Sequence, residues 1–331
     1  MTDAKRKIGQ FEVGPIGLGC MSLSHGYGAP PAEDHSERLL NHALDAGYDF
    51  LDTATAYGQG RNERLIGRAL KSRRHEFVLA SKCGMFADGD KRWVDCRPET
   101  IRTAIDASLD RLGFDHIDLY YLHRRDFEVP IEDSVGELKR AIEAGKIGAY
   151  GLSEMSAETL RRAHAVHPVA ALQTEYALWT RNPEIAVLDA CRELGTTFVA
   201  FSPVGRGFLA DAVPDPALLG KGDMRPWMPR FKEPHFSANL KLLDEFRVIA
   251  GDLGCTPAQL SLAWLLHKDD RLVPIPGTTS IEHMEENLAA ARIRLTAEVV
   301  ARLDALINER TVQGERYPQA MQVSIDTESF A

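Results

Sequence analysis

The sequence has little cysteine, and none of it lies in a spacing typical of a disulfide framework or a zinc site. The five cysteines are scattered along the chain and never form a Cys-x-x-Cys pair. They are Cys20, Cys83, Cys96, Cys191 and Cys255. The histidines lack His-x-His and His-x-x-x-His spacing, and no carboxylates cluster at ligand spacing, so we expect no metal. Cys83, beside Lys82, is either a reactive thiol or, as is commoner, a small buried side chain.

Long apolar runs and an excess of positive charge are also absent. No run approaches the roughly 20 residues of a membrane helix, and the basic stretch 1–10 has no apolar segment behind it. The 39 lysines and arginines against 48 aspartates and glutamates leave a net charge of -9, which argues against nucleic acid or an anionic membrane as partner. We therefore expect a soluble protein of the reducing cytoplasm.

Short apolar runs alternate with segments of helical spacing along most of the chain. Runs typical of buried strands end at Gly19, Asp52, Lys82, His123, Ser153, Glu175, Ser202 and Pro276. Helical spacing covers 34–46, 62–70, 98–112, 131–144, 156–166, 183–194 and 256–267. Eight strands, each followed by a helix with no change of composition between halves, predict an α/β fold. We expect one domain, 1–331, folded as a closed (β/α)8 TIM barrel.

Three segments lie outside this repeat. A hairpin is expected around Phe11 to Pro15, and an extra helix over 296–308 followed by an irregular tail. The segment 205–236 holds five prolines and is far longer than an ordinary βα loop, so it should cover the mouth of the barrel. A doubly wound sheet, the competing architecture, would normally carry G-x-G-x-x-G before a helix; the nearest match, at 17–22, lacks the third glycine.

An acid, a phenol and an amine follow neighbouring predicted strands. Asp52 ends one strand, Tyr57 lies in the turn after it, and Lys82 ends the next strand. Active sites of such barrels lie at the carboxyl ends of the strands, where these side chains should meet. An adjacent ammonium lowers the pKa of a phenol by favouring the phenolate, which makes Tyr57 a candidate general acid and Lys82 its tuner. The alternative is a structural ion pair, Asp52 with Lys82, capped by the tyrosine.

A histidine ends the next strand around the ring. His123 alone would more often be structural, but beside Tyr57 it can hydrogen-bond a substrate carbonyl and hold it against the phenol. Four such groups at adjacent strand ends favour a catalytic site over the structural interpretation. Protonating a carbonyl oxygen without a metal calls for a partner directed at carbon, and hydride from a cofactor is the natural one.

Several motifs, taken in order, resemble those of the aldo-keto reductase superfamily over about residues 14–308. They are Asp-Thr-Ala-x-x-Tyr-Gly at 52–58, Ala-Ser-Lys at 80–82, the run 108–113 leading to the strand 117–123, Gly-Lys-Ile at 145–147, Gly-Leu-Ser-Glu at 151–154, Phe-Ser-Pro-Val-Gly-Arg-Gly at 201–207 and Ile-Pro-Gly-Thr at 275–278. The resemblance implies a catalytic tetrad of Asp52, Tyr57, Lys82 and His123. Tyr57 is then the proton donor, and a nicotinamide supplies hydride for the reduction of aldehydes and ketones.

The same resemblance assigns residues to NADPH. Ser153 and Gln173 match residues that hydrogen-bond the carboxamide, and Phe201 matches a position, usually tyrosine, that stacks on the nicotinamide. Small residues from 202 to 207 would let backbone amides approach the pyrophosphate. The full implied cofactor set is Gly19, Cys20, Met21, Asp52, Ser153, Glu154, Gln173, Phe201, Ser202, Pro203, Val204, Gly205, Arg206, Gly207, Gly277, Thr278, Thr279, His283, Glu286 and Asn287.

The sequence departs from the family pattern at three of these positions. Glu154 stands where the best-known branch has asparagine, although a Ser-Glu pair is familiar in the branch with Gly-Leu-Ser-Glu. Gly277 and His283 stand where many members have lysine and arginine for the 2'-phosphate. NADPH is therefore the family default, and NAD remains possible.

The sequence says less about which residues form the substrate pocket. Aromatic and sulfur side chains in mouth loops suggest an apolar pocket formed by Tyr27, Met85, Trp93 and Trp227 with Tyr57 and His123. Phe86 lies in the same loops.

Besides a carbonyl reductase, two other functions stay open: a redox-sensing regulatory subunit that binds NADP(H) with little turnover, and a Schiff-base lyase using Lys82. Asp52 beside Lys82 argues for a charged, non-nucleophilic amine.

Overall fold

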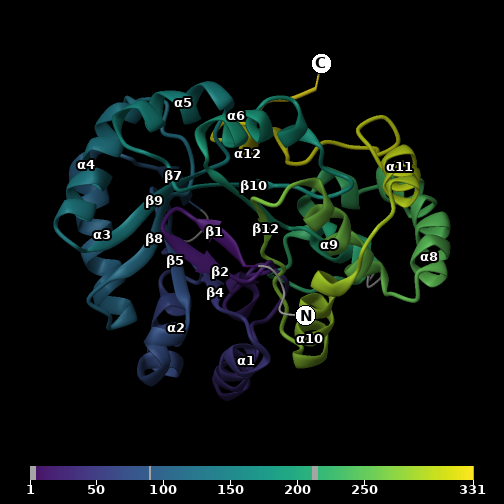
Figure 1. Cartoon of the computed structure of the whole chain (residues 1–331), viewed down its shortest axis with the longest axis horizontal. Coiled ribbons are helices and arrows are strands. Elements are labelled where there is room, and N and C mark those ends of the chain that lie inside the picture. Colours follow the sequence, from purple (N-terminus) through teal and green to yellow (C-terminus); the bar gives the residue numbers. More distant parts are fainter. Residues whose placement is uncertain (1–4, 89–90, 211–214, 331) are drawn as a thin grey trace.

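The computed structural model describes residues 5–88, 91–210 and 215–330, and its centre is an eight-stranded parallel sheet (Figure 1). The strands are β3 (Leu18–Gly19), β4 (Phe50–Asp52), β5 (Val78–Cys83), β8 (Ile117–Leu122), β9 (Ile147–Ser153), β10 (Ala171–Glu175), β11 (Thr197–Phe201) and β12 (Leu272–Pro274). They pair in that order. Gly17 and Gly19 donate backbone N–H groups to Pro274 and Pro276, at 3.0 and 3.1 Å, and join the first strand to the last. The predicted (β/α)8 barrel is thus confirmed.

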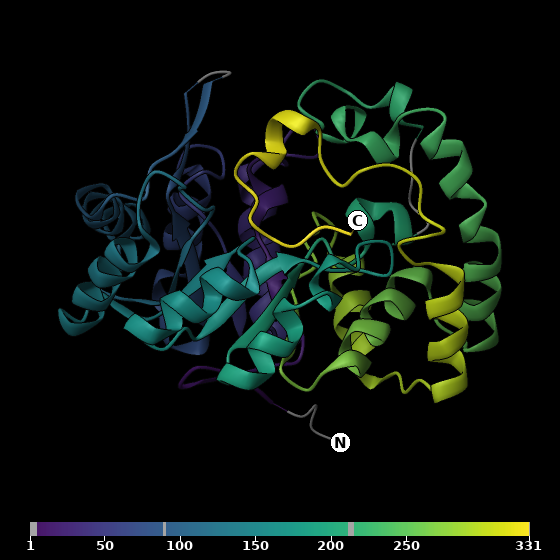
Figure 2. The same ribbon diagram turned by 90° about the horizontal axis from the view of Figure 1, so that it is seen from above.

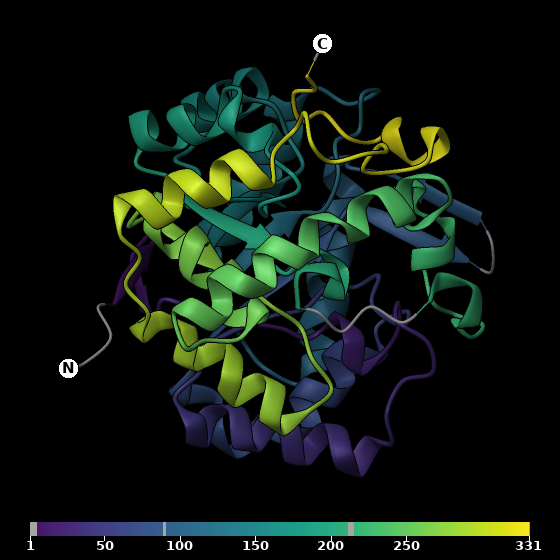
Figure 3. The same ribbon diagram turned by 90° about the vertical axis from the view of Figure 1, so that its right-hand side faces the viewer.

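Helices surround the sheet, as the alternation of the sequence predicts (Figures 1 and 3). They are α1 (Glu33–Ala46), α2 (Arg61–Leu70), α3 (Pro98–Leu112), α4 (Ile131–Glu143), α5 (Ala157–Val166), α6 (Val187–Leu194), α7 (His235–Leu240), α8 (Leu242–Asp252), α9 (Pro257–Lys268), α10 (Ile281–Ala289), α11 (Ala297–Leu306) and α12 (Gln319–Gln322). Among the described residues, none of these helices combines the length and apolar character needed to cross a membrane.

Apolar side chains fill the barrel toward its amino end. Phe50, Leu119 and Val273 are fully buried there, and they pack with Ile8 and Val13 of the N-terminal hairpin. That hairpin consists of β1 (Arg6–Ile8) and β2 (Phe11–Val13), close to the predicted position. Figure 2 shows it on the opposite side of the barrel from the C-terminal segment. The carboxyl ends of the strands are therefore the end left free for polar chemistry.

Several elements differ from the prediction. A hairpin, β6 (Met85–Asp88) with β7 (Lys91–Val94), rises from the loop after β5, and helix α8 precedes α9; neither was predicted. The expected irregular tail contains the short helix α12 and lies along the carboxyl ends of the strands (Figure 2). The long proline-rich segment forms the short 3-10 helices η4 (Gly205–Ala210), η5 (Pro216–Leu218), η6 (Arg225–Trp227) and η7 (Pro229–Phe231).

Candidate active site

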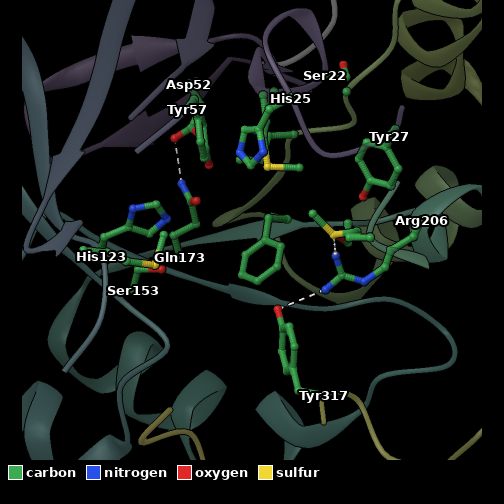
Figure 4. A pocket seen from close by; sticks show the side chains of 18 of the residues that line it. Ser22, His25, Tyr27, Asp52, Tyr57, His123, Ser153, Gln173, Arg206 and Tyr317 are labelled. Atoms are coloured by element: carbon green, nitrogen blue, oxygen red, sulfur yellow. Dashed lines mark hydrogen bonds between the residues drawn. The ribbon is translucent and has the colours of Figure 1, made fainter. Parts of the chain in front are cut away.

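A cavity of about 910 Å³ opens at the carboxyl ends of the strands (Figure 4). Its wall comes from strand ends, the β6–β7 hairpin, the proline-rich segment, the turn before α10 and the C-terminal segment. The size falls within the range of small-molecule and cofactor sites. One continuous space therefore joins the predicted catalytic residues to the predicted cofactor residues.

Lys82 lies at the centre of a hydrogen-bonded group at the bottom of the cavity. The side chain is fully buried. Its ammonium donates to the carboxylate of Asp52, to the carbonyl of Thr53 at 2.8 Å and to the hydroxyl of Tyr57 at 3.3 Å. The buried ion pair and the phenol–amine contact are thus both present, in one cluster.

The local sequence explains how Tyr57 reaches this position. β4 and β5 are parallel neighbours, so Asp52 and Lys82 emerge side by side. In the turn after β4 the N–H of Tyr57 bonds to Ala54 at 3.0 Å. The buried amide of Asn62, at the start of α2, accepts from Thr53 at 2.6 Å and donates to the carbonyl of Cys20 at 2.8 Å. Sequence analysis missed this role of Asn62, whose polar type inside a helical segment was the available signal.

Burial dominates the ionisation of these groups. Burial raises the pKa of Tyr57, and the charge of Lys82 opposes this rise. Lys82 therefore acts in the sense expected from the sequence, and burial, which was not part of that expectation, sets the net direction. Burial alone would lower the pKa of Lys82, but Asp52 and Tyr57 outweigh it and the pKa is raised. Lys82 thus stays charged, and Tyr57 keeps its proton at neutral pH.

Two histidine rings border the phenol (Figure 4). His123 meets Tyr57 edge to face at 5.8 Å between ring centroids, and His25 lies at the same distance on a tilted plane. Burial, helped by Arg124, Lys82 and His25, holds the pKa of His123 well below 6.5, so the imidazole is neutral. Its buried Nδ1 has no hydrogen-bond partner among the described residues. His25 was not singled out from the sequence, where it follows a turn without any distinguishing motif.

Most of the predicted cofactor residues line the cavity. They are Gly19, Met21, Asp52, Ser153, Gln173, Phe201, Ser202, Pro203, Val204, Arg206, Gly207, Gly277, Thr278, Thr279, His283, Glu286 and Asn287. Gln173 donates its amide to Asp52 at 2.7 Å, so it touches the catalytic cluster directly (Figure 4). The cofactor roles of these residues stay predictions.

Glu154, Cys20 and Gly205 do not line the cavity. The carboxylate of Glu154 accepts from Arg316 at 2.6 Å and Thr327 at 2.8 Å, away from the cavity. Glu154 lies just beyond the end of β9, where its backbone is left-handed with φ of 54°, and of the two neighbours only Ser153 lines the cavity. The buried thiol of Cys20 contacts the carbonyl of Leu18 at 3.7 Å. A Cβ on Gly205 would approach the indole of Trp179 at 2.9 Å, on the side away from the cavity.

The side chain of Arg206 has a role that the sequence did not predict. Its backbone is left-handed, with φ of 58°, and its guanidinium donates to Glu175 at 2.9 Å and to the hydroxyl of Tyr317 at 3.0 Å. Tyr317 comes from the C-terminal segment and lines the cavity (Figure 4). The loop after β11 is thereby tied to the end of the chain.

Three of the four predicted aromatic and sulfur pocket residues lie at the mouth. Tyr27, Met85 and Trp93 line the cavity together with Tyr57 and His123. Trp93 stacks on Phe86, with ring centroids 5.7 Å apart. Trp227 is 71% exposed and is not part of the wall, so its predicted contact with substrate has no support in the geometry.

The cavity wall is compatible with an elongated dinucleotide. A Cβ on Gly19 would lie 2.8 Å from the carbonyl of Ile275, so only glycine lets β3 pack this closely against the segment after β12. The hydroxyl of Ser22, buried beside Gly277, has no partner among the described residues. A buried polar atom without a partner is rare in proteins, and a bound ligand is a common explanation.

Comparison with known families matches residues 15–308 to the Aldo/keto reductase family. Among curated proteins, the chain is 44% identical over 325 residues to the aldo-keto reductase yakc of Schizosaccharomyces pombe, whose name specifies NADP(+). That match covers 96% of this chain and 95% of the relative.

Solved structures of similar proteins share the fold. A glycerol dehydrogenase from Gluconobacter oxydans superposes with a TM-score of 0.85 at 26% identity, over 100% of this chain and 98% of the other. An aldo/keto reductase from Klebsiella pneumoniae, solved with NADP and acetate, gives 0.73 at 25% identity, over 96% and 99%.

Proposed function

The chain belongs to the aldo/keto reductase family, and on that basis we propose that it reduces aldehydes or ketones to alcohols with NADPH. The observation that carries the proposal is the buried cluster in which Lys82 bonds to both Asp52 and Tyr57, with His123 facing the phenol. The NADP(+) in the name of the yeast relative and the NADP in the Klebsiella pneumoniae structure support the choice of cofactor.

In this mechanism Tyr57 is the general acid. Its hydroxyl donates a proton to the carbonyl oxygen, and the neutral His123 donates a second hydrogen bond that positions the same oxygen. As the phenol loses its proton, the nearby ammonium of Lys82 stabilises the phenolate, and Asp52 keeps that ammonium charged and oriented. Bound NADPH supplies the hydride to the carbonyl carbon.

Most of the residues expected to hold the cofactor line the cavity. Ser153 and Gln173 would bind the carboxamide, and Phe201 would stack on the ring. Backbone amides between 202 and 207 would face the pyrophosphate, and the turn 277–279 with α10 would take the adenosine end.

Lyase chemistry at Lys82 is disfavoured by the contacts of its ammonium. A Schiff base needs a neutral amine, whereas this one donates to a carboxylate, a carbonyl and a phenol. Asp52 and Tyr57 also raise the pKa of Lys82 despite its burial, which keeps the amine protonated and non-nucleophilic.

The proposal is tested by measuring NADPH oxidation by the purified protein with a panel of aliphatic and aromatic aldehydes and ketones. We expect turnover that depends on both the carbonyl compound and the dinucleotide. Titration of cofactor fluorescence gives the dissociation constant separately. Dinucleotide binding without turnover on any compound would overturn the proposal and favour the redox-sensing regulatory subunit.

A further inference from the structure

Arg124 follows the catalytic histidine and borders the same part of the cavity. Its Nη1 donates to the carbonyl of His123 at 2.7 Å and lies 3.4 Å from the hydroxyl of Ser153. Its charge also acts to lower the pKa values of both His123 and Tyr57, although burial is the larger influence on each. The guanidinium is therefore within electrostatic range of the position where the carbonyl would react.

No carboxylate among the described residues pairs with this guanidinium. Across residues 5–88, 91–210 and 215–330, no ion pair within 4.0 Å involves Arg124. Only Nη1 takes part in the hydrogen bonds described above. The edge formed by Nε and Nη2 therefore has no acceptor in the described part of the chain, and that edge is the one that binds a carboxylate through two parallel hydrogen bonds.

Three other arginines of the cavity wall are already neutralised or enclosed, and a fourth, Arg92 of the β6–β7 hairpin, is exposed. Arg206 pairs with Glu175 at 2.9 Å, and Arg225 pairs with Asp223 at 2.7 Å. Arg125 is buried, donates to backbone carbonyls and lies over the ring of Phe127. Arg124 differs from Arg92 because it is half-buried and contacts the carbonyl of His123 at 2.7 Å, and it differs from the other three because no acid among the described residues pairs with it.

Acids near Arg124 are committed elsewhere or lie at the edge. The carboxylate of Asp52 is bound by Lys82, and that of Asp126 accepts backbone N–H groups of Cys96 at 2.9 Å and Glu128 at 3.0 Å. Glu128 itself is exposed. Removing a cation partly from water without a neighbouring anion costs free energy. An anionic ligand that binds there therefore gains a strong, directional interaction.

We propose that the physiological carbonyl substrate carries a carboxylate and that Arg124 binds it while the carbonyl oxygen meets Tyr57 and His123. Arg124 is thus a specificity-determining residue for small oxo-acids or carboxyl-bearing aldehydes. The inference rests on the proposed reductase function and adds the class of its substrate.

Matched pairs of substrates test the inference. Succinic semialdehyde is compared with butanal, and 4-carboxybenzaldehyde with 4-methylbenzaldehyde, using kcat/KM for NADPH-dependent reduction. We expect the wild type to prefer the charged member of each pair by at least about tenfold. Arg124→Met should lower the charged-to-neutral ratio by about ten- to a hundredfold, the usual effect of removing a charge-assisted hydrogen bond.

Two further variants separate the carboxylate contact from general effects. Arg124→Lys keeps the charge without the two-pronged edge and should restore part of the ratio. Arg97→Met removes an equal charge from a residue outside the cavity wall, paired with Asp95 at 2.7 Å, and should leave the ratio as in the wild type. Circular dichroism checks that each variant is folded.

A binding measurement complements the kinetics. The product 4-(hydroxymethyl)benzoate should bind the complex with NADP(+) more weakly in Arg124→Met than in the wild type, as measured by calorimetry.

Equal rates for both members of each pair in the wild type would overturn the inference while leaving the reductase function intact. A larger NADPH dissociation constant in Arg124→Met, together with an equal loss of kcat/KM for the charged and the neutral substrate of each pair, would also overturn the inference. That result would assign Arg124 to the cofactor. No reduction of any compound would overturn the proposed function itself.

Discussion

Arg316 donates to the buried carboxylate of Glu154 at 2.6 Å, although 162 positions separate the two residues. Glu154 directly follows Ser153, whose side chain lines the cavity. The second carboxylate of the group, Glu175, pairs with Arg206 at 2.9 Å and lies 3.7 Å from Arg316. The ends of β9 and β10, the loop after β11 and the C-terminal segment are therefore joined by one buried network of charges.

Removing one cation from this network should detach the C-terminal segment. Arg316→Met leaves Glu154 buried without its cation, and breaking a buried pair costs about 3–5 kcal/mol of folding free energy. We expect lower stability in urea and faster proteolysis within 309–330. Arg310→Met is the control, because Arg310 is 88% exposed and should change stability by less than about 0.5 kcal/mol. Equal behaviour of the two variants would mean that the network does not hold the segment.

The phenol oxygen of Tyr57 should carry most of the catalytic effect. Tyr57→Phe removes the proton donor and keeps the ring, so the reduction rate should fall by about 10² to 10⁴ while NADPH still binds. Steady-state kinetics and fluorescence titration measure the two quantities. Tyr150→Phe is the matched control, since that hydroxyl bonds to Ala163 and His167 in a helix and loop outside the cavity wall. Wild-type turnover in Tyr57→Phe would exclude this tyrosine as the acid.

Lys82 should set how readily Tyr57 gives up its proton. Burial raises the pKa of Tyr57 and Lys82 opposes that rise, so Lys82→Met should raise this pKa further and weaken the acid. Reduction should then be slow across about pH 6 to 9, because the wild-type phenol is already protonated throughout that range. The reverse oxidation, which needs the phenolate, should require more alkaline solution than in the wild type.

The pH profiles of both directions, recorded for wild type and variant, provide the measurement. Circular dichroism must show a folded variant, since Asp52 loses its partner. Superimposable profiles would remove the tuning role from Lys82.

The repeat of strands and helices could be predicted because each buried strand, such as 117–122, is apolar until its polar end. The same rule located Asp52, Lys82 and His123. The direction of the Glu154 side chain could not be predicted, because this residue lies beyond the end of the strand and its backbone is left-handed. The contact between Arg316 and Glu154 could not be predicted either, since nothing local links positions so far apart. The net pKa shift of Tyr57 depends on burial by segments from the whole chain and likewise needs the structure.

The turn that should receive the 2'-phosphate of NADPH lacks a lysine or arginine. Gly277, Thr278 and His283 line this end of the cavity. The hydroxyl of Thr278 already accepts the N–H of Ser280 at 3.0 Å. A hydrogen bond from Ser280, followed by weaker influences that include His283 and His35, lowers the pKa of Glu282 and keeps a negative charge nearby. His35, which the sequence did not point to, contacts the carbonyl of Thr279 at 2.7 Å.

These contacts predict a modest preference for NADPH over NADH. A phosphate dianion is normally selected by arginine or lysine, and this turn instead offers hydroxyls, amides, the exposed His283 and the half-buried His35. His283→Arg should widen the gap by about 1 to 3 kcal/mol through a charge-assisted bond. Dissociation constants for both dinucleotides, measured for wild type and variant, test this. A large NADPH preference in the wild type would show that a residue outside the turn binds the phosphate.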